Sequence, residues 1–477
     1  MPGLSPVEPS FASGPRRALS GSAKGGRRGR PAACSRRRLP LHRAQRMCQS
    51  MKWGGSISMS SEHTPQISNE LLLCEARTSE WLHEVRCEDC LACTFETKVA
   101  RRDLEAFVAR VLQVYRLPPD DAALTARVLV AADLRGVASH GVARLGRYIK
   151  GLQEGYIVPG VAFDIREPAP AIGVIDAKNG VGQVVSELAM NMAVEKAKAN
   201  GVGVVTVGNS NHYGIAGYYV QKAIAAGMVG MSLTNAAPLV VPTNGADAML
   251  GTNPIALGAP GENGLDFLLD MATSVVPRGK LEVYDRNRRQ MPVGWAVDEK
   301  GYDTRNPGHV LANLLSRAGG GILPLGGRGE EFSGYKGYGL ALLVDVLSGV
   351  LSGAAYGPEV DNVRGAPGSS PSNAPRVGHF FLALDIARFM PLEEFRGRLA
   401  DLFRMLKDSR KALDKSVIYV HGEKEQVRAR LHEQSGIPLA ENVLAALRKI
   451  AAEAGVAPPA TVGDRLRRNV LDGEEGR

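Results

Sequence analysis

Apolar residues in the first clearly patterned part of the chain recur at helical spacing. Residues 101–116 and 119–135 both place apolar side chains three or four positions apart. Pro118 and Pro119 stand between the two segments, and a proline disfavours the helical conformation for the residue before it. The pattern therefore predicts two helices with a break at the prolines.

Strand-like and helical patterns alternate from residue 171 onward. Short runs rich in β-branched or aromatic residues predict strands, and longer segments with apolar residues three or four apart predict helices. The expected strands are residues 172–175, 202–207, 229–233, 380–384 and 416–420. The expected helices are residues 184–198, 215–226, 338–351, 392–407 and 439–453. This alternation predicts an α/β fold.

Residues 1–95 show neither periodicity. Gly, Ser, Pro and Arg dominate the first fifty residues. Such a segment cannot bury enough apolar surface to offset its chain entropy, so we expect a disordered basic extension. Three interpretations stay open: an inert extension or misassigned start, a targeting segment, or a functional arm.

The positive charge of the chain is concentrated in this extension. The 477 residues carry a formal net charge of +9, but residues 1–52 contain twelve Lys or Arg and a single acid, Glu8. The remainder therefore carries a net charge of −2, and we expect no nucleic-acid partner for it. No apolar run approaches the roughly 18 residues that span a bilayer, so we also expect a soluble protein without a membrane partner.

Cysteine is confined to the same extension. All six cysteines lie before residue 94, so the rest of the chain has no disulfide, which suits a reducing cytoplasm. His83, Cys87, Cys90 and Cys93 have metal-like spacing, but the residues around them do not resemble a zinc ribbon or knuckle. We therefore predict no metal site.

One stretch, residues 135–144, carries an imidazole and a guanidinium four positions apart. On a helix this spacing would place His140 and Arg144 on the same face. A histidine that titrates near neutral pH, beside an arginine that can grip a carboxylate, suits the oxidation or reduction of an α-hydroxy or α-oxo acid. The alternative is a helix end with a cation near its C-terminal dipole and Gly141 as the stop.

Polar residues follow successive expected strands further along the chain. Residues 209–214, which include His212, and residues 234–235 each come directly after a strand, and residues 250–256 form a further glycine-led turn. Ligands of α/β folds bind at the carboxyl ends of strands. One such turn would be ordinary capping, but three of them, with His140 and His212, favour a site.

Two further segments hold candidate binding residues. Residues 269–274 have the composition of a buried strand, and Asp270 within it needs a partner such as a protonated histidine or a ribose hydroxyl. Residues 334–339 place Lys336 in a glycine loop before a helix, which suits a phosphate, although a plain turn with a solvated lysine has the same sequence. No G-x-G-x-x-G motif occurs, which disfavours a standard Rossmann domain.

Eight motifs now occur in a fixed order: RGVASHGVAR, DAKNGVGQ, NSNHYGIAGYY, LGTNPIA, LDMATS, PVGWAVDEKG, LPLGG and GYKGYGLALLVDVLSG. With them the chain resembles, over residues 99–457, the malate/L-lactate dehydrogenase family of the second, non-Rossmann type. The resemblance implies an α/β, non-Rossmann nicotinamide-dependent dehydrogenase fold with mixed sheets and a helical N-terminal subdomain. It also implies a homodimer whose site lies between domains and subunits.

The expected domains follow from the patterns and the resemblance together. They are the extension (1–95), a helical N-terminal part with the catalytic histidine (96–170), an α/β core that binds cofactor and substrate (171–370), and a C-terminal α/β part with a helical tail (371–477).

The resemblance assigns roles to individual residues. It implies that His140 is the acid/base, that Arg144 grips the substrate carboxylate, and that Ser139 and His212 line the pocket. Asp270 either contacts the cofactor or pairs with the catalytic histidine. The candidate cofactor-binding residues are Leu269, Asp270, Met271, Ala272, Thr273, Ser274, Val275, Thr234, Asn235, Tyr335, Lys336, Gly337, His421, Gly422 and Glu423.

The sequence thus predicts a cytoplasmic oxidoreductase that transfers a hydride between NAD or NADP and a small 2-oxo or 2-hydroxy acid. A second enzyme reading is the reduction of a cyclic imino acid, in which His140 acts on nitrogen chemistry. A third is a binding or regulatory protein that works through the basic arm, and the intact site residues argue against it.

Overall fold

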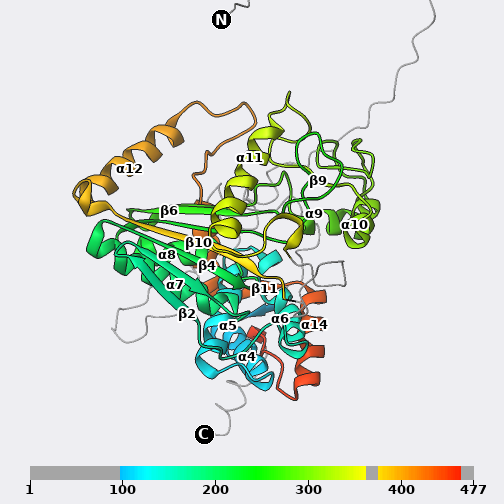
Figure 1. Cartoon of the computed structure of the whole chain (residues 1–477), viewed down its shortest axis with the longest axis horizontal. Coiled ribbons are helices and arrows are strands. Elements are labelled where there is room, and N and C mark those ends of the chain that lie inside the picture. The colour runs from blue at the N-terminus through cyan, green and yellow to red at the C-terminus, as the bar shows by residue number, and fades with distance from the viewer. Residues whose placement is uncertain (1–96, 361–373, 464–477) are drawn as a thin grey trace, which may run out of the picture. The chain divides into compact units, whose positions relative to one another are not determined.

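The largest sheet in the computed structural model, which describes residues 97–360 and 374–463, has seven strands (Figure 1). Its strand order is β2-β3-β4-β10-β5-β6-β7. β3 and β4 pair in parallel and the other neighbours are antiparallel, so the sheet is mixed, as expected. The strands are β2 (Asp164–Ala169), β3 (Ile172–Asp176), β4 (Val202–Ser210), β5 (Met228–Thr234), β6 (Ile255–Glu262), β7 (Leu265–Met271) and β10 (Val377–Asp385). The predicted strands at 172–175, 202–207, 229–233 and 380–384 are confirmed.

The two predicted N-terminal helices are confirmed as α4 (Arg101–Val114) and α5 (Pro119–Leu134). The end of α4 and the start of α5 each have a local cause. Arg116 adopts a left-handed backbone with φ 69°, which ends α4, and α5 then starts with a proline at its first position, where the missing N–H costs nothing.

The end of the chain packs against this helical start. α6 (Leu145–Gln153) and α14 (Glu441–Ala454) share one apolar core with the two N-terminal helices, which confirms the predicted helix near residues 439–453. Close by, β1 (Thr97–Val99) pairs antiparallel with β11 (Ile437–Leu439). The last helices therefore belong structurally to the part of the chain that precedes the sheet.

Two helices cover one face of the large sheet. α7 (Gly182–Asn200) and α8 (Gly217–Ala225) confirm the helices expected at 184–198 and 215–226, and they pack on β4, β5 and β6 (Figure 1). α7 comes close to the sheet because β4 has a glycine at the contact: a Cβ on Gly203 would lie 2.0 Å from the carbonyl oxygen of Ala193.

The other face of the sheet is covered by α11 (Gly334–Val344) and a π-helix (Asp345–Val350). Alternate residues of β10 serve the two faces, since Phe381 packs toward α7 and α8 whereas Phe380 packs against Val344 of α11. The helix predicted at 338–351 is therefore present, but it starts four residues earlier and its last turns are π-helical. α12 (Leu392–Asp408), predicted at 392–407, lies against β6.

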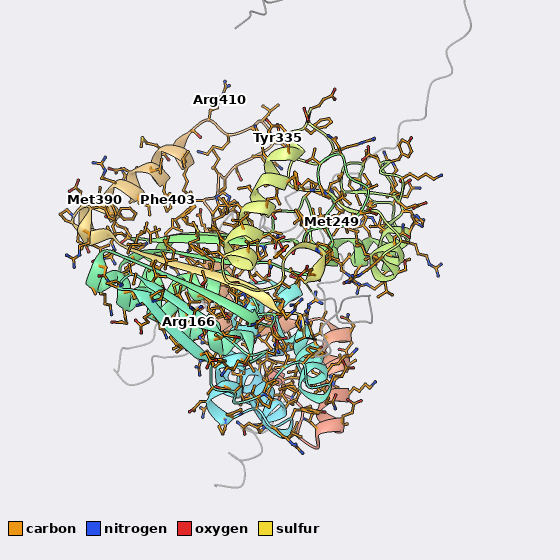
Figure 2. The ribbon with its side chains drawn as sticks, viewed as in Figure 1. Arg166, Met249, Tyr335, Met390, Phe403 and Arg410 are labelled. Carbon is orange, nitrogen blue, oxygen red and sulfur yellow. The ribbon has the colours of Figure 1, made fainter. Side chains whose placement is uncertain are left out.

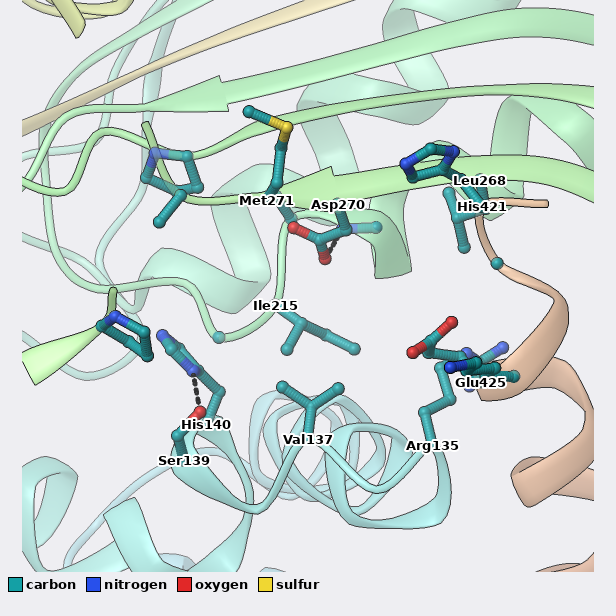
Figure 3. Close-up of a pocket in the computed structure, with 18 of the residues that line it drawn as sticks. Arg135, Val137, Ser139, His140, Ile215, Leu268, Asp270, Met271, His421 and Glu425 are labelled. Atoms are coloured by element: carbon teal, nitrogen blue, oxygen red, sulfur yellow. Dashed lines mark hydrogen bonds between the residues drawn. The ribbon is translucent and has the colours of Figure 1, made fainter. Parts of the chain in front are cut away.

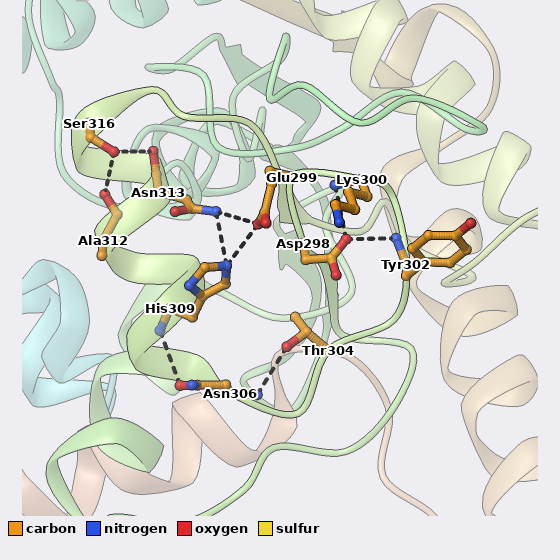
Figure 4. Close-up of polar contacts among 10 residues, drawn as sticks. All are labelled: Asp298, Glu299, Lys300, Tyr302, Thr304, Asn306, His309, Ala312, Asn313 and Ser316. Carbon is orange, nitrogen blue, oxygen red and sulfur yellow. Dashed lines mark hydrogen bonds and ion pairs between the residues drawn. The ribbon is translucent and has the colours of Figure 1, made fainter.

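A smaller region between β7 and α11 has an apolar core of its own and several polar turns at its surface (Figure 4). Asn306 caps a helix by accepting from the backbone N–H of His309 at 3.1 Å, and Asp298 accepts from the N–H groups of the turn that follows it. Glu299 lies between the two features and bonds His309 Nε2 at 2.8 Å. The elements here are α9 (Arg278–Arg286), β8 (Ala296–Val297), α10 (Pro307–Ser316) and β9 (Gly321–Ile322).

Two expectations about strands are wrong. Residues 416–420 form no strand: directly after them the carbonyl oxygen of His421 accepts from the Leu268 N–H of β7 at 3.1 Å, and α13 (Glu423–Ser435) follows. Residues 269–274 are not a buried strand either. β7 ends at Met271, and Leu268 is its one buried residue; β7 is the edge strand of the sheet, and its outer side meets the segment before α13 instead of another strand.

Short 3-10 helices complete the description: Ala138–His140, Val142–Arg144, Gly357–Glu359 and Ile386–Arg388. Among the described residues, no helix is long and apolar enough to cross a membrane. The expectations for residues 1–95, including the cysteine motif, lie outside the described residues.

Candidate active site

A cavity of about 570 Å³ opens between the end of α5, the start of α8, the end of β7 and the segment before α13 (Figure 3). Stretches that lie far apart in the sequence therefore meet there, including residues just before β6. Its lining includes Arg135, Val137, Ser139, His140, Ile215, Gly217, Gln221, Pro254, Leu268, Asp270, Met271, Ala272, Tyr419, His421, Gly422, Lys424 and Glu425.

His140 reaches this cavity from a turn and not from an α-helix. It ends one 3-10 helix, and Gly141, with extended backbone angles, separates it from the next, which ends at Arg144. The spacing of one helical turn expected for His140 and Arg144 is therefore wrong. The two residues are tied together differently, because Arg144 Nε donates to the carbonyl oxygen of Ser139 at 2.7 Å.

His140 is held as a neutral imidazole. Its Nδ1 lies 2.8 Å from Ser139 Oγ (Figure 3). Burial lowers the pKa of His140 to about 4, and the nearby charges of Arg144 and Arg147 contribute to the same effect. At neutral pH the ring is therefore unprotonated and can accept a proton.

His212 stacks on His140, with ring centroids 5.6 Å apart and an angle of 18° between the planes. Tyr148 Oη lies 2.6 Å from His212 Nδ1, and the Gly214 N–H donates to the same nitrogen at 3.3 Å. A backbone N–H can only donate, so Nδ1 is an acceptor and the proton of the neutral ring is on Nε2. Burial lowers the pKa of His212 well below its usual value, which keeps the ring in this form.

Asp270 faces the cavity at the end of β7. Its Oδ2 accepts from the N–H of Gly217, the first residue of α8, at 2.8 Å. The carboxyl group is exposed to the cavity but enclosed by the protein around it, and this desolvation raises the pKa of Asp270 to about 6. The partner of Asp270 in the structure is therefore the backbone N–H of Gly217 and not a histidine, because His140 bonds Ser139 instead.

The other candidate cofactor-binding residues divide into two groups. Met271, Ala272, His421 and Gly422 line the cavity together with Asp270. Outside the lining are Leu269, Thr273, Ser274, Val275, Glu423, Thr234, Asn235, Tyr335, Lys336 and Gly337.

Several residues in the second group have other contacts. Glu423 pairs with Lys407 and accepts from the backbone of the preceding turn. Thr234 and Asn235 are buried, with Thr234 Oγ1 2.8 Å from His379 Nδ1. Tyr335, labelled in Figure 2, is 48% exposed at the first turn of α11.

Several residues in or beside the cavity are not among the residues predicted from the sequence. Arg135 and Glu425 stand at the end of the cavity away from His140 (Figure 3), and Tyr148 supports His212. Arg135 belongs to the same ten-residue stretch as His140, and Tyr148 lies eight residues after it, so both were within reach of a local search. Glu425 had no signal, because its segment meets the others only in the folded chain.

The cavity fits a nicotinamide group. Apolar side chains of Val137, Ile215 and Met271 offer flat contact for a ring, and the carboxylates of Asp270 and Glu425 could accept from ribose hydroxyls. The described residues contain no group of three or more His, Cys, Asp or Glu that could hold a metal ion.

Comparison with known proteins identifies the family of the chain. The family model for malate/L-lactate dehydrogenase matches residues 99–448. The chain is 47% identical over 359 residues to malate dehydrogenase from Pyrococcus abyssi, covering 75% of this chain and 95% of that protein. It is 38% identical over 346 residues to L-sulfolactate dehydrogenase from Methanocaldococcus jannaschii, covering 72% and 94%. The solved structure of malate dehydrogenase from Pyrococcus horikoshii OT3 matches with a TM-score of 0.68 at 42% identity, covering 78% and 98%. The chain belongs to the malate/L-lactate dehydrogenase family.

Proposed function

We propose that this protein is a nicotinamide-dependent dehydrogenase that interconverts a small 2-hydroxy acid and its 2-oxo acid, with His140 as the acid/base. The observation that carries the proposal is a neutral, desolvated imidazole that lines the cavity and stacks on a second imidazole. The family membership supports it, because the relatives are named as dehydrogenases of malate and sulfolactate.

In the oxidation, His140 receives the proton of the substrate C2 hydroxyl. NAD or NADP, when bound, would supply the acceptor for the hydride that leaves C2. In the tautomer that donates its Nδ1–H to Ser139 Oγ, the Nε2 lone pair of His140 would be the base. The reverse reaction needs a protonated His140, and an anionic substrate beside the ring favours that form.

Arg144 and His212 do not line the cavity, but both lie next to residues that do, since Arg144 bonds Ser139 and His212 stacks on His140, and both are suited to hold the substrate. Arg144 uses its Nε–H on the Ser139 carbonyl, so its two terminal amines are the ones that would bind a carboxylate. His212 has its proton on Nε2, and this N–H would donate to a substrate oxygen beside His140.

The cofactor would lie along the wall formed by Asp270, Met271, Ala272, His421 and Gly422. Gly422 brings the backbone close to β7, since a Cβ there would lie 2.9 Å from Leu268 Cβ. Lys336 and Glu423 are further candidates for contacts with the cofactor, but within a single chain neither of them lines this cavity.

The enzyme works as a homodimer in the cytoplasm in this proposal. The outer face of α11 and the π-helix exposes Leu343, Val346, Val350 and Leu351, each 45–58% accessible, which is the surface that a second copy would cover. Sedimentation equilibrium that returned the mass of one chain would contradict the dimer.

The proposal predicts a specific pattern in a substrate panel. We expect nicotinamide oxidation with small 2-oxo acids and either NADH or NADPH, followed by absorbance. Arg144→Lys should raise KM for these acids about 10-fold or more, because an ammonium cannot reproduce the bidentate fork. Turnover of cyclic imino acids alone would contradict the proposed substrate class, and an unchanged KM in Arg144→Lys would contradict the role of Arg144.

A further inference from the structure

Asp133 lies beneath the turn that carries His140. It belongs to the last turn of α5 and is 5% exposed. Its Oδ2 accepts from the backbone N–H of Val142 at 2.7 Å. Its Oδ1 occupies the place that a side chain on Gly141, the residue before Val142, would take, since a Cβ there would lie 2.0 Å from it.

The Asp133 carboxyl group therefore holds the part of the turn that follows His140. The bond from Arg144 Nε to the Ser139 carbonyl holds the part that precedes it. His140 lies in the sequence between these two contacts, and its ring stacks on His212. The direction of the His140 ring therefore depends on where Asp133 holds Gly141 and Val142.

A buried carboxyl group without a basic partner is an expensive way to secure a turn. Burial raises the pKa of Asp133 to about 7, and the Val142 N–H is the one group that lowers it. Both protonation states keep an oxygen that can accept from this N–H, so the contact survives titration. A residue retained at such a cost directly under a reactive histidine is a candidate for function.

We propose that Asp133 is a positioning residue for the dehydrogenase reaction: its carboxyl group holds the 138–144 turn so that His140 faces the cavity. This inference rests on the proposed acid/base role of His140. Asp133 does not line the cavity, so its effect should appear in turnover and not in cofactor binding.

The first test compares Asp133→Ala with Asp133→Asn in the full chain. Asp133→Ala should lower kcat about 10²-fold, the order expected when a reacting group is displaced by about 1 Å, with NADH Kd unchanged within about twofold. Asp133→Asn should stay within about fivefold of wild type, because its amide oxygen still accepts from Val142. Thr125→Val, also buried on α5, is the matched control and should leave kcat unchanged.

The second test changes the other partner of the same contact, Gly141. Gly141→Ala should lower kcat as Asp133→Ala does, because the new methyl group displaces the carboxyl group. The double variant should be no worse than Asp133→Ala alone, since the shortened side chain leaves room for the methyl group. Independent effects would multiply to about 10⁴-fold and would contradict direct contact. If Asp133→Ala does not fold, Gly141→Ala and Asp133→Asn decide the proposal.

A readout besides activity separates this inference from the proposed function. The ¹³Cε1 NMR signal of His140 should shift in Asp133→Ala and Gly141→Ala, and stay in place in Asp133→Asn and Thr125→Val. Near-wild-type kcat with an unshifted signal in the first two variants would overturn the positioning role, as would an Asp133→Asn variant as impaired as Asp133→Ala. Full activity in His140→Asn would instead overturn the proposed acid/base.

Discussion

At the scale of single residues, the sequence identified the histidines but not how they are held. His140 and His212 were identifiable because an imidazole is rare and chemically distinctive, and the structure stacks them. The link between His140 and Arg144 was misjudged, because Gly141 takes an extended backbone that no helical spacing rule anticipates. Thr234 had the right residue type but is buried, with its hydroxyl bonded to His379. The residue type alone does not predict which face of the sheet a side chain points to.

The charge next to His140 has a testable effect on its titration. Arg147 lowers the pKa of His140, so Arg147→Gln should raise it. For oxidation the neutral ring is required, so kcat/KM falls as pH drops toward about 4 in wild type, and the fall should begin at higher pH in the variant. We expect a displacement of about 0.2–0.7 pH, the size of an exposed charge interaction.

The control for this experiment is Lys150→Gln on the same helix. Lys150 is exposed, pairs with Glu154 at 3.6 Å, and is not among the charges that act on His140. The difference between variant and wild-type profiles cancels the titration of the substrate carboxylate. A profile of Arg147→Gln that coincides with that of Lys150→Gln would contradict the electrostatic account of His140.

At the scale of elements, periodicity predicted most helices and strands because each pattern is local. The helices at 184–198 and 392–407 and the strand at 202–207 appear within a few residues of their expected ends. Residues 416–420 failed because their apolar side chains serve the cavity wall and not a sheet, since Tyr419 and Val420 line the cavity. A strand-like composition indicates side chains packed against neighbouring residues, and the residues of a segment that lines a cavity are packed in the same way.

The contact between α7 and β4 allows a stability prediction. Gly203→Ala would place a methyl group 2.0 Å from the Ala193 carbonyl oxygen, so helix and sheet must separate. We expect the free energy of unfolding to fall by about 2–4 kcal/mol, measured by urea denaturation. Gly279→Ala on α9 is the control, because its Cβ would meet nothing within 4 Å, and it should be neutral or stabilising by up to about 1 kcal/mol. Equal midpoints for the two variants would show that the close approach is not real.

At the scale of the whole molecule, the order of the strands was beyond sequence reasoning. β10 enters the sheet between β4 and β5, to residues about 145 to 180 positions away along the chain, and no local pattern encodes such a pairing. The cavity has the same origin, because its walls come from α5, α8, β7 and the segment before α13. The resemblance to the family predicted a mixed sheet from ordered motifs, and this is confirmed. The domain boundaries stay a prediction.

The most direct test of the acid/base role is single-turnover reduction by His140→Asn in the full chain. NADH is bound first, a 2-oxo acid is added, and nicotinamide absorbance is followed while NADH affinity is measured by fluorescence. Asparagine approximates the size of the ring but cannot carry a proton. We predict a rate about 10²–10⁴-fold below wild type with NADH Kd unchanged within about twofold. A rate within about threefold of wild type, at full NADH affinity, would contradict the assignment of His140.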